Sequence, residues 1–306
     1  MRLCCFTTMS SNMRWVDGFI AVDWGTSNRR AYRIDTSGKC VDEFDDGKGI
    51  LSVPEGSFPT AVAEIRKRLG DLPLLLAGMV GSNRGWKDAG YVATPAGLDD
   101  IVNALVWVGE REAIVPGISY LANDRADVMR GEEVQIFGGI AAGLVDPDGL
   151  VCHPGTHNKW LTVRRSRIIE FRTVMTGELF SLLKEHSILS DLLQGPVEAN
   201  DVFKQAARWA IDNEALPASL FSVRSRVLLG QARKEDAASY ASGLLIGSDV
   251  RIGLSLPTGA IISVVGRPDL THLYVAAIHE ASRDTVEQDG ERCFIAGAHE
   301  IVKRLG

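Results

Sequence analysis

The first part of the chain shows short apolar runs that predict strands, followed by longer runs with apolar residues at helical spacing. Three strand-like runs come first, and helical and strand-like segments then alternate, over residues 19–24, 30–35, 40–44, 59–69, 72–78, 97–105 and 113–117. The predicted order of elements is therefore β-β-β-α-β-α-β.

The second part repeats this plan around a helical insertion. Its strand-turn-strand segment and third strand are followed by several helices, and then by a strand, a helix, a strand and a last helix, over residues 149–163, 167–174, 175–254, 259–266, 269–281, 292–298 and 299–306. Without the insertion, the order matches that of the first part. Alternating helices and strands predict an α/β protein with mixed sheets covered by helices.

Two polar turns occupy the same place in the two parts. The sequences "DWGTSN" (23–28) and "HPGTHN" (153–158) share Gly-Thr-x-Asn in register. Gly, Thr and Asn are common in turns, so coincidence is the alternative explanation. Because the matched turns sit in a matched order of elements, we favour a duplication.

The composition of these turns suits a bound phosphate. Glycine at a tip lets the backbone approach a ligand, and backbone N–H and hydroxyl groups donate hydrogen bonds to phosphate oxygens. A carboxylate two residues before the glycine can hold Mg²⁺, usually through water. The candidates are Asp23 for the metal, and Gly25, Thr26, Ser27, Gly155 and Thr156 for the phosphates.

Composition narrows the class of protein. The chain has 306 residues, 45% hydrophobic and 24% charged, with a net charge of -6, which suits two globular domains and gives no sign of a nucleic-acid or membrane binder. Five scattered cysteines without a CxxC pair argue against disulfides and a cysteine zinc site, and favour a cytoplasmic location. We expect residues 1–15 to form a disordered extension.

The two-turn plan resembles the superfamily of actin, Hsp70 and sugar kinases, whose first hairpin reads D-x-G-[ST]. No GxxxxGK[ST] or Rossmann glycine motif competes with it. The resemblance implies a duplicated actin-like ATPase (ribonuclease H-like) fold, with domains at 16–130 and 131–306 around a nucleotide cleft. It also implies ATP and Mg²⁺ as cofactors, and places Gly266, at the end of a strand, against the adenosine.

A candidate general base precedes a helix expected over residues 133–144. Asn123-Asp124 is followed seven residues later by Gly131-Glu132, a spacing that resembles bacterial glucokinase-like sugar kinases, in which the Asp takes the proton of the sugar hydroxyl. A carboxylate beside the attacking oxygen suits phosphoryl transfer. The alternative is structural: Asp124 caps a turn, and Asp127 caps the following helix or contacts site residues without touching the substrate itself.

Several longer motifs resemble one kinase family. The stretches "AVDWGTSNRRAY", "LLAGMVGSNRGW", "VMRGEEVQIFG", "PGTHNKW", "FRTVMTGEL" and "SGLLIGSDV" together resemble the 2-dehydro-3-deoxygalactonokinases of D-galactonate catabolism, over about residues 17–300. The resemblance implies phosphorylation of the 6-hydroxyl of 2-dehydro-3-deoxy-D-galactonate by ATP. Three positions depart from the family pattern, namely Arg29, Asn158 and Leu273.

A glycine-rich loop after a first-domain strand suits a sugar acid. A carboxylate ligand prefers Arg, and a polyol prefers amide and indole donors. The loop offers Ser82, Asn83, Arg84 and Trp86, and Arg130 is a second candidate for the carboxylate, between which the sequence does not choose. Trp86 is equally explained as a packing aromatic. Metal binding by His153 and His157 is disfavoured.

Two other functions stay open. One is a kinase for an epimeric or related hexonate, because stereochemistry at one carbon cannot be read from a loop. The other is a non-catalytic, nucleotide-gated sensor on the same fold, against which the presence of both Asp23 and Asp124 argues. Homo-oligomer formation is also left open.

Overall fold

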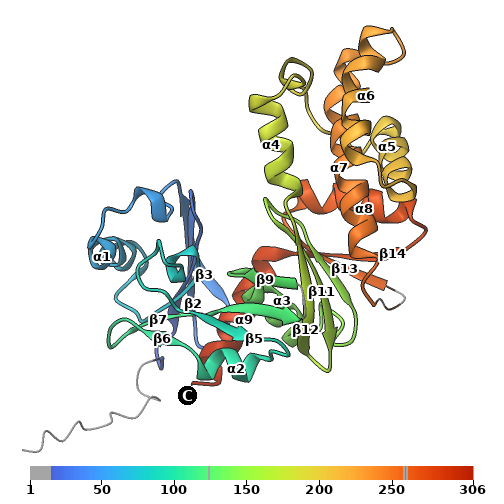
Figure 1. Ribbon diagram of the computed structural model, residues 1–306. Helices are drawn as coiled ribbons and strands as arrows, with labels where there is room; N and C mark the ends of the chain where they lie inside the picture. Colours follow the sequence, from blue (N-terminus) through green and yellow to red (C-terminus); the bar gives the residue numbers. More distant parts are fainter. Residues whose placement is uncertain (1–14, 123–124, 258, 260, 306) are drawn as a thin grey trace, which may run out of the picture. The chain divides into compact units, whose positions relative to one another are not determined.

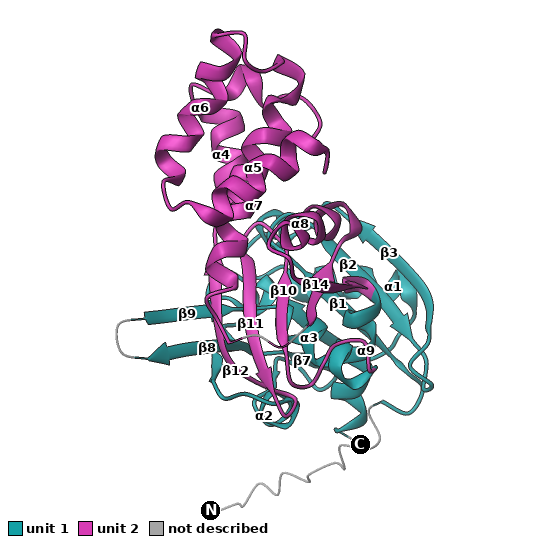
Figure 2. Cartoon of the chain, turned by 90° about the vertical axis from the view of Figure 1, so that its right-hand side faces the viewer, with its two compact units in different colours: residues 1–142, 292–306 teal, residues 143–291 magenta. Residues whose placement is uncertain are grey.

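The computed structural model describes residues 15–122, 125–257, 259 and 261–305. The chain forms two compact units, one of residues 1–142 and 292–306 and the other of residues 143–291 (Figure 2). This division differs from the predicted domains at 16–130 and 131–306, because α3 (Glu132–Ala141) and most of α9 (Gly290–Lys303) belong to the first unit.

The predicted N-terminal extension lies outside the described residues, except for its last position. Trp15 is buried and packs against Phe19 and Trp107, with ring centroids 5.9 and 6.1 Å apart. Residue 15 therefore belongs to the folded part of unit 1.

Unit 1 is built on a six-stranded sheet in the order β3-β2-β1-β4-β7-β6, of which Figure 1 labels β3, β2, β7 and β6. The hairpin strands β1 and β2 are antiparallel, whereas β1, β4 and β7 run parallel. Its elements include β1 (Phe19–Trp24), β2 (Arg29–Ile34), β3 (Cys40–Asp46), η2 (Ile50–Ser52), α1 (Phe58–Leu69), β4 (Leu74–Gly78), η3 (Met79–Gly81), α2 (Leu98–Asn103), β6 (Val106–Trp107) and β7 (Glu112–Ile114). The seven predicted elements are present in the predicted order, and the structure adds β6, a strand that the sequence did not predict, between α2 and β7.

A second, three-stranded sheet in unit 1 is absent from the sequence prediction. Its order is β5-β8-β9, with β5 (Tyr91–Ala93), β8 (Gly117–Ala122) and β9 (Arg125–Met129), and the β8–β9 hairpin extends from the rest of the unit (Figure 2). Asp127 lies in β9 opposite Tyr120. Because α3 begins only at Glu132, the predicted helix-capping role of Asp127 is wrong.

Unit 2 repeats the sheet of unit 1. Its strand order is β12-β11-β10-β13-β14, and its directions match those of β3-β2-β1-β4-β7 pair by pair. The elements are β10 (Leu150–His153), β11 (Asn158–Arg164), β12 (Arg167–Val174), β13 (Ile261–Gly266), α8 (Pro268–Glu280) and β14 (Asp284–Asp289). This repetition confirms the duplicated plan.

One predicted strand is a helix. Residues 292–298 belong to α9, whose buried residues Cys293, Phe294, Ala298 and Ile301 recur at helical spacing. The edge strand is instead the polar segment β14, which pairs with β13 on one side only. A short apolar run does not by itself separate a buried helix from a strand, and edge strands tolerate charge.

The helical insertion packs mainly on itself. It comprises α4 (Thr176–His186), η4 (Ser190–Leu192), α5 (Asp201–Asp212), α6 (Leu216–Leu228), η5 (Lys234–Asp236) and α7 (Ala237–Gly253). Buried Leu193, Ala210, Val223 and Leu244 form part of its own core, and α7 continues into the core of the sheet through Val250. In Figure 2 the insertion stands at one end of the unit 2 sheet.

Small residues let α3 and α9 pack closely within unit 1. A Cβ on Gly138 would overlap the carbonyl of Cys293, and a Cβ on Gly297 would overlap the carbonyl of Val134. The small-residue helix expected from the sequence therefore has α9 as its close partner. Among the described residues, no helix is long and apolar enough to cross a membrane.

Candidate functional site

The hairpin between β1 and β2 presents Thr26 and Ser27 at the surface. Gly25 donates its N–H to the carbonyl of Asn28 at 2.9 Å, which closes the turn. The carbonyls of Gly25 and Ser27 accept from Ile50 and Gly49, both at 3.0 Å. These bonds occupy tip carbonyls, while both hydroxyl side chains remain exposed.

Gly49 is the residue that fits this hairpin against its neighbour. A Cβ at position 49 would overlap the carbonyl of Thr26 and the backbone of Ser27. Only glycine leaves enough room there. Gly49 was not among the residues predicted from the sequence, although its place beside a turn-rich loop was a signal for it.

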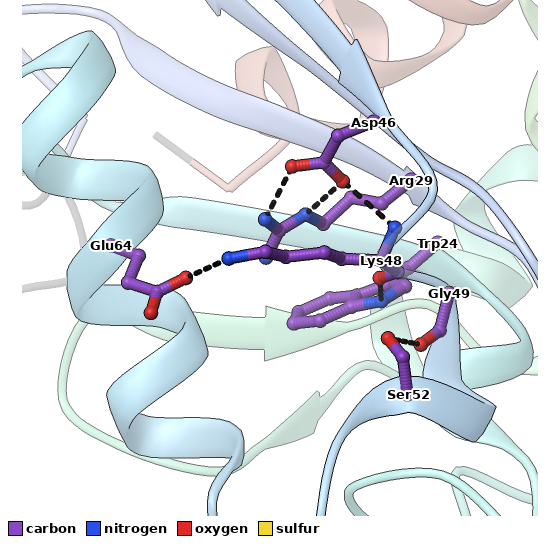
Figure 3. Close-up of polar contacts among 7 residues, drawn as sticks. All are labelled: Trp24, Arg29, Asp46, Lys48, Gly49, Ser52 and Glu64. Atoms are coloured by element: carbon purple, nitrogen blue, oxygen red, sulfur yellow. Dashed lines mark hydrogen bonds and ion pairs between the residues drawn. The ribbon is translucent and has the colours of Figure 1, made fainter.

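An ion pair supports the base of the hairpin (Figure 3). Arg29 is 2% exposed and contacts Asp46 twice, with Nε–Oδ1 at 3.2 Å and Nη2–Oδ2 at 2.8 Å. Its guanidinium lies 5.2 Å from the ring centroid of Trp24, and the Trp24 indole donates to the carbonyl of Lys48 at 2.9 Å. The departure from the family pattern at Arg29 is therefore a structural ion pair between β2 and β3.

Asp23 lies at the carboxyl end of β1, where β4 ends at Gly78. A Cβ on Gly78, whose φ is +88°, would lie 3.3 Å from Asp23 Oδ1. Burial raises the pKa of Asp23 to about 6, Arg30 opposes this shift, and the negative charge of Glu132 adds to it. Ionised Asp23 is therefore destabilised by burial and by Glu132, and a bound cation would stabilise it. This property fits the predicted Mg²⁺ site.

The start of α3 adds two acidic residues that the sequence analysis did not assign. Gly131 has a φ of +105°, and a Cβ there would lie 3.3 Å from the Cα of Gly78. Its N–H donates to both carboxylate oxygens of Glu133, at 2.9 and 2.7 Å. Burial and the charge of Glu132 raise the pKa of Glu133 to about 8, so this side chain is mostly neutral at pH 7.

The hairpin between β10 and β11 repeats the exposed tip in unit 2. Thr156 is exposed, and a Cβ on Gly155 would meet only the carbonyl of His157, at 3.9 Å. The Thr156 carbonyl accepts from Glu178 N at 3.0 Å. A Cβ on Gly177 would lie 2.7 Å from the Gly155 carbonyl, so Gly177 fits against this tip as Gly49 does in unit 1.

The predicted adenosine residue lies beside this second hairpin. A Cβ on Gly266 would lie 3.6 Å from the carbonyl of Pro154, directly before Gly155. The parallel strands β10 and β13 both end here. Ligands of open α/β sheets bind at the carboxyl ends of strands, which supports a nucleotide-binding role for this edge.

Some polar residues of the loop at 78–86 form hydrogen bonds within the loop, and others have side chains exposed to solvent. Ser82 is buried, donates to the carbonyl of Met79 at 2.8 Å and accepts from Arg84 N at 3.3 Å. Trp86 stacks on Phe58, with ring centroids 6.1 Å apart. Asn83 and Arg84 have exposed side chains. The accessible groups for a sugar acid are therefore Asn83 and Arg84.

Arg130 is held inside unit 1. Its side chain is 5% exposed, donates to the carbonyl of Gly90 at 3.1 Å and lies over the ring of Tyr91 at 4.4 Å. A Cβ on Gly81 would lie 3.0 Å from Arg130 Nη1, so this arginine packs behind the loop. The geometry favours Arg84 over Arg130 for a ligand that arrives from solvent.

Asp124, the predicted general base, lies outside the described residues. Ala122 and Arg125, the described residues that flank positions 123 and 124, are paired at the end of the β8–β9 ladder. Within the described part of the chain, no group of three or more His, Cys, Asp or Glu side chains could hold a metal ion.

A family model described as 2-keto-3-deoxy-galactonokinase matches residues 23–301. The chain belongs to this family. It is 35% identical over 287 residues to the 2-dehydro-3-deoxygalactonokinase of Escherichia coli (strain K12), covering 92% of this chain and 97% of that one. It is therefore a sugar-acid kinase of D-galactonate catabolism, as the sequence motifs predicted.

Solved structures agree with this assignment and with the fold. A crystal structure from Sinorhizobium meliloti, to which the same activity has been attributed, superposes with a TM-score of 0.87 at 32% identity and covers 94% of this chain and 98% of that one. The activator of the 2-hydroxyisocaproyl-CoA dehydratase from Clostridium difficile, solved with bound ADPNP, has a TM-score of 0.50 at 10% identity, over 94% of this chain and 95% of that one. The predicted actin-like ATPase fold is confirmed.

Proposed function

We propose that this kinase transfers a phosphoryl group from ATP to the 6-hydroxyl of 2-dehydro-3-deoxy-D-galactonate, with the two hairpins as its phosphate-binding elements. The observation that carries this proposal is the repeated exposed tip, Gly25-Thr26 and Gly155-Thr156, each at the carboxyl end of the first strand of its sheet. Backbone N–H groups and hydroxyls at such tips suit phosphate oxygens.

Asp23 would hold Mg²⁺ through water, and the cation would neutralise charge on the phosphates. The residue is well suited because it lies beside Gly78 and is repelled by the negative charge of Glu132, a repulsion that a cation would relieve. Ser27 would add a hydroxyl to the first phosphate site. Gly266 would lie against the nucleoside beside the second hairpin.

Arg84 would pair with the carboxylate of the sugar acid, and Asn83 would bind its hydroxyl groups. Arginine presents a planar pair of donors that matches a carboxylate. Both side chains are exposed, whereas Ser82, Trp86 and Arg130 support the loop through packing and internal bonds. Arg84→Gln should raise the KM for the sugar acid and leave that for ATP unchanged. The matched control is Lys67→Gln, which also removes one positive charge, from an exposed position on α1.

Asp124 would take the proton of the 6-hydroxyl. This role rests on the Asn-Asp and Gly-Glu spacing alone. Asp124→Asn should lower kcat by about 10²–10⁴, with the lower end favoured because the transition state is loose. Asp127→Asn is the control, and Glu132→Gln is the competing variant because Glu132 acts on Asp23. Normal turnover in Asp124→Asn with loss in Glu132→Gln would move the role to Glu132.

The deciding experiment is a coupled assay that measures ADP release. The substrates are 2-dehydro-3-deoxy-D-galactonate and its gluconate epimer, each tested with and without Mg²⁺. The proposal expects Mg²⁺-dependent turnover that prefers the galactonate form. A preference for the epimer would support the related hexonate kinase instead. Nucleotide binding without turnover on either compound would support a sensor and overturn the catalytic proposal.

A further inference from the structure

A buried carboxylate in unit 2 collects hydrogen bonds from three different elements. Asp249, on α7, is 0% exposed. Its Oδ1 accepts from Asn158 Nδ2 at 2.9 Å and from Trp160 Nε1 at 2.7 Å. Its Oδ2 accepts from Thr176 Oγ1 and Tyr274 OH, both at 2.5 Å. All four donors are uncharged side chains, and together they saturate the two oxygens.

Two of these donors flank the contacts that hold the second hairpin. Asn158 is the first residue of β11 and lies two residues after Thr156 of the tip. Thr176 precedes Gly177, which fits against the Gly155 carbonyl, and Glu178, which donates to the Thr156 carbonyl. One carboxylate therefore joins the base of the hairpin to the segment that braces its tip.

The other contacts fix the carboxylate itself. A Cβ on Gly253 would overlap the ring of Trp160, so α7 lies directly against β11. Tyr274 ties Asp249 to α8, the helix that follows Gly266. Burial raises the pKa of Asp249, and its hydrogen bonds oppose that shift. A buried carboxylate is costly unless every acceptor is satisfied, so this network specifies one arrangement.

We propose that Asp249 is a positioning residue for nucleotide binding, which holds the Gly155-Thr156 hairpin in its ligand-ready conformation through Asn158 and Thr176. The inference rests on the proposed phosphate role of that hairpin. Asp249 does not touch the phosphates, because its side chain is fully buried. It also accounts for the departure from the family pattern at Asn158, whose amide supplies one of the four donors.

The test uses the full-length kinase and measures ATP affinity by calorimetry beside the melting temperature. Asp249→Asn keeps the shape but replaces one acceptor oxygen with a donor. It should weaken ATP binding about tenfold, because a small displacement of a binding group is costly, and change the KM for the sugar acid by less than about twofold. Val223→Ala, in the core of the insertion, should lower the melting temperature without changing ATP affinity.

A pair at Thr176 keeps the test decisive if Asp249→Asn does not fold. Thr176→Val removes the hydroxyl and should weaken ATP binding, whereas Thr176→Ser keeps it and should restore affinity. Unchanged ATP affinity in folded Asp249→Asn or Thr176→Val would overturn the inference, and the phosphate role would survive if Gly155→Val still lost ATP. Equal ATP binding by Gly155→Val and the wild type would remove the phosphate role and the inference with it.

Discussion

The hairpin of unit 1 is supported by charged side chains, whereas the hairpin of unit 2 is supported by neutral donors around one buried carboxylate. Arg29 and Asp46 form an ion pair below the first tip, and Asp46 is partly exposed. Asn158 and Asp249 meet below the second tip, where both are 0% exposed. Solvent screens the first pair more than the second. Similar backbone turns can therefore be held by different chemistry.

The tips themselves are fitted in the same way. Gly49 in unit 1 and Gly177 in unit 2 each come from a segment that follows the third strand of the sheet, and each leaves no room for a Cβ. In both units a backbone N–H from that segment bonds a tip carbonyl. The two hairpins therefore share a glycine that packs against the tip, but different side chains hold the base of each hairpin.

The largest expected effect concerns the residue two positions before each tip glycine, Asp23 in unit 1 and His153 in unit 2. Asp23→Asn should lower kcat by roughly 100-fold or more, because a bound cation contributes several kcal/mol to phosphoryl transfer. His153→Asn should cost less than about tenfold, because no metal ion is assigned to His153. Steady-state kinetics across Mg²⁺ concentrations measure both. Equal losses would remove the metal assignment.

The second comparison concerns the two tip glycines, Gly155 and Gly25, and separates effects on ATP binding from effects on stability. Gly155→Val should weaken ATP binding by at least about tenfold, or 1.4 kcal/mol, with a small change in melting temperature, because the added atoms enter open space. Gly25→Val should weaken ATP binding similarly but destabilise more, since its Cβ lies 3.3 Å from the Asn28 carbonyl. Calorimetry and thermal melts test both variants. ATP binding at wild-type strength would falsify the phosphate assignment.

The third comparison concerns the two bracing glycines. Gly49→Ala should lower the free energy of unfolding by about 1–3 kcal/mol, as overpacking does. Gly177→Ala should cost less, because the three nearest atoms to its Cβ lie at 2.7, 2.8 and 3.2 Å, whereas those nearest to the Gly49 Cβ lie at 2.3, 2.4 and 2.4 Å. Urea denaturation measures the difference. The control is Gly47→Ala, at an exposed position where a Cβ would meet nothing within 4 Å.

The last prediction concerns the buried carboxyl group of Glu133 in unit 1. The pKa of Glu133 is about 8 in the folded protein, against an ordinary value of 4.5. Its contribution to stability is therefore full below pH 4.5 and is lost as pH rises toward 8. Glu133→Gln cannot ionise, so it should melt a few degrees above the wild type at pH 8 and close to it at pH 5. A constant difference across this range would contradict the buried, neutral carboxyl.

The sequence by itself determined the repeated order of elements and the two turns. Gly25-Thr26 and Gly155-Thr156 could be found because turn chemistry and apolar periodicity are local properties of the chain. The longer motifs also identified the kinase family before any contact was known. The same local reasoning failed at residues 292–298, where a short apolar run fits a helix as well as a strand.

Only the tertiary structure decided which residues hold the turns. Gly49, Gly177 and Asp249 lie 23, 22 and 94 positions after Thr26, Gly155 and Gly155, respectively, and no local pattern links them to the tips. The choice between Arg84 and Arg130 likewise depends on burial, which the packing of Tyr91 and Gly81 creates. Close approach and desolvation arise between segments distant in sequence, so they become defined only when the chain has folded.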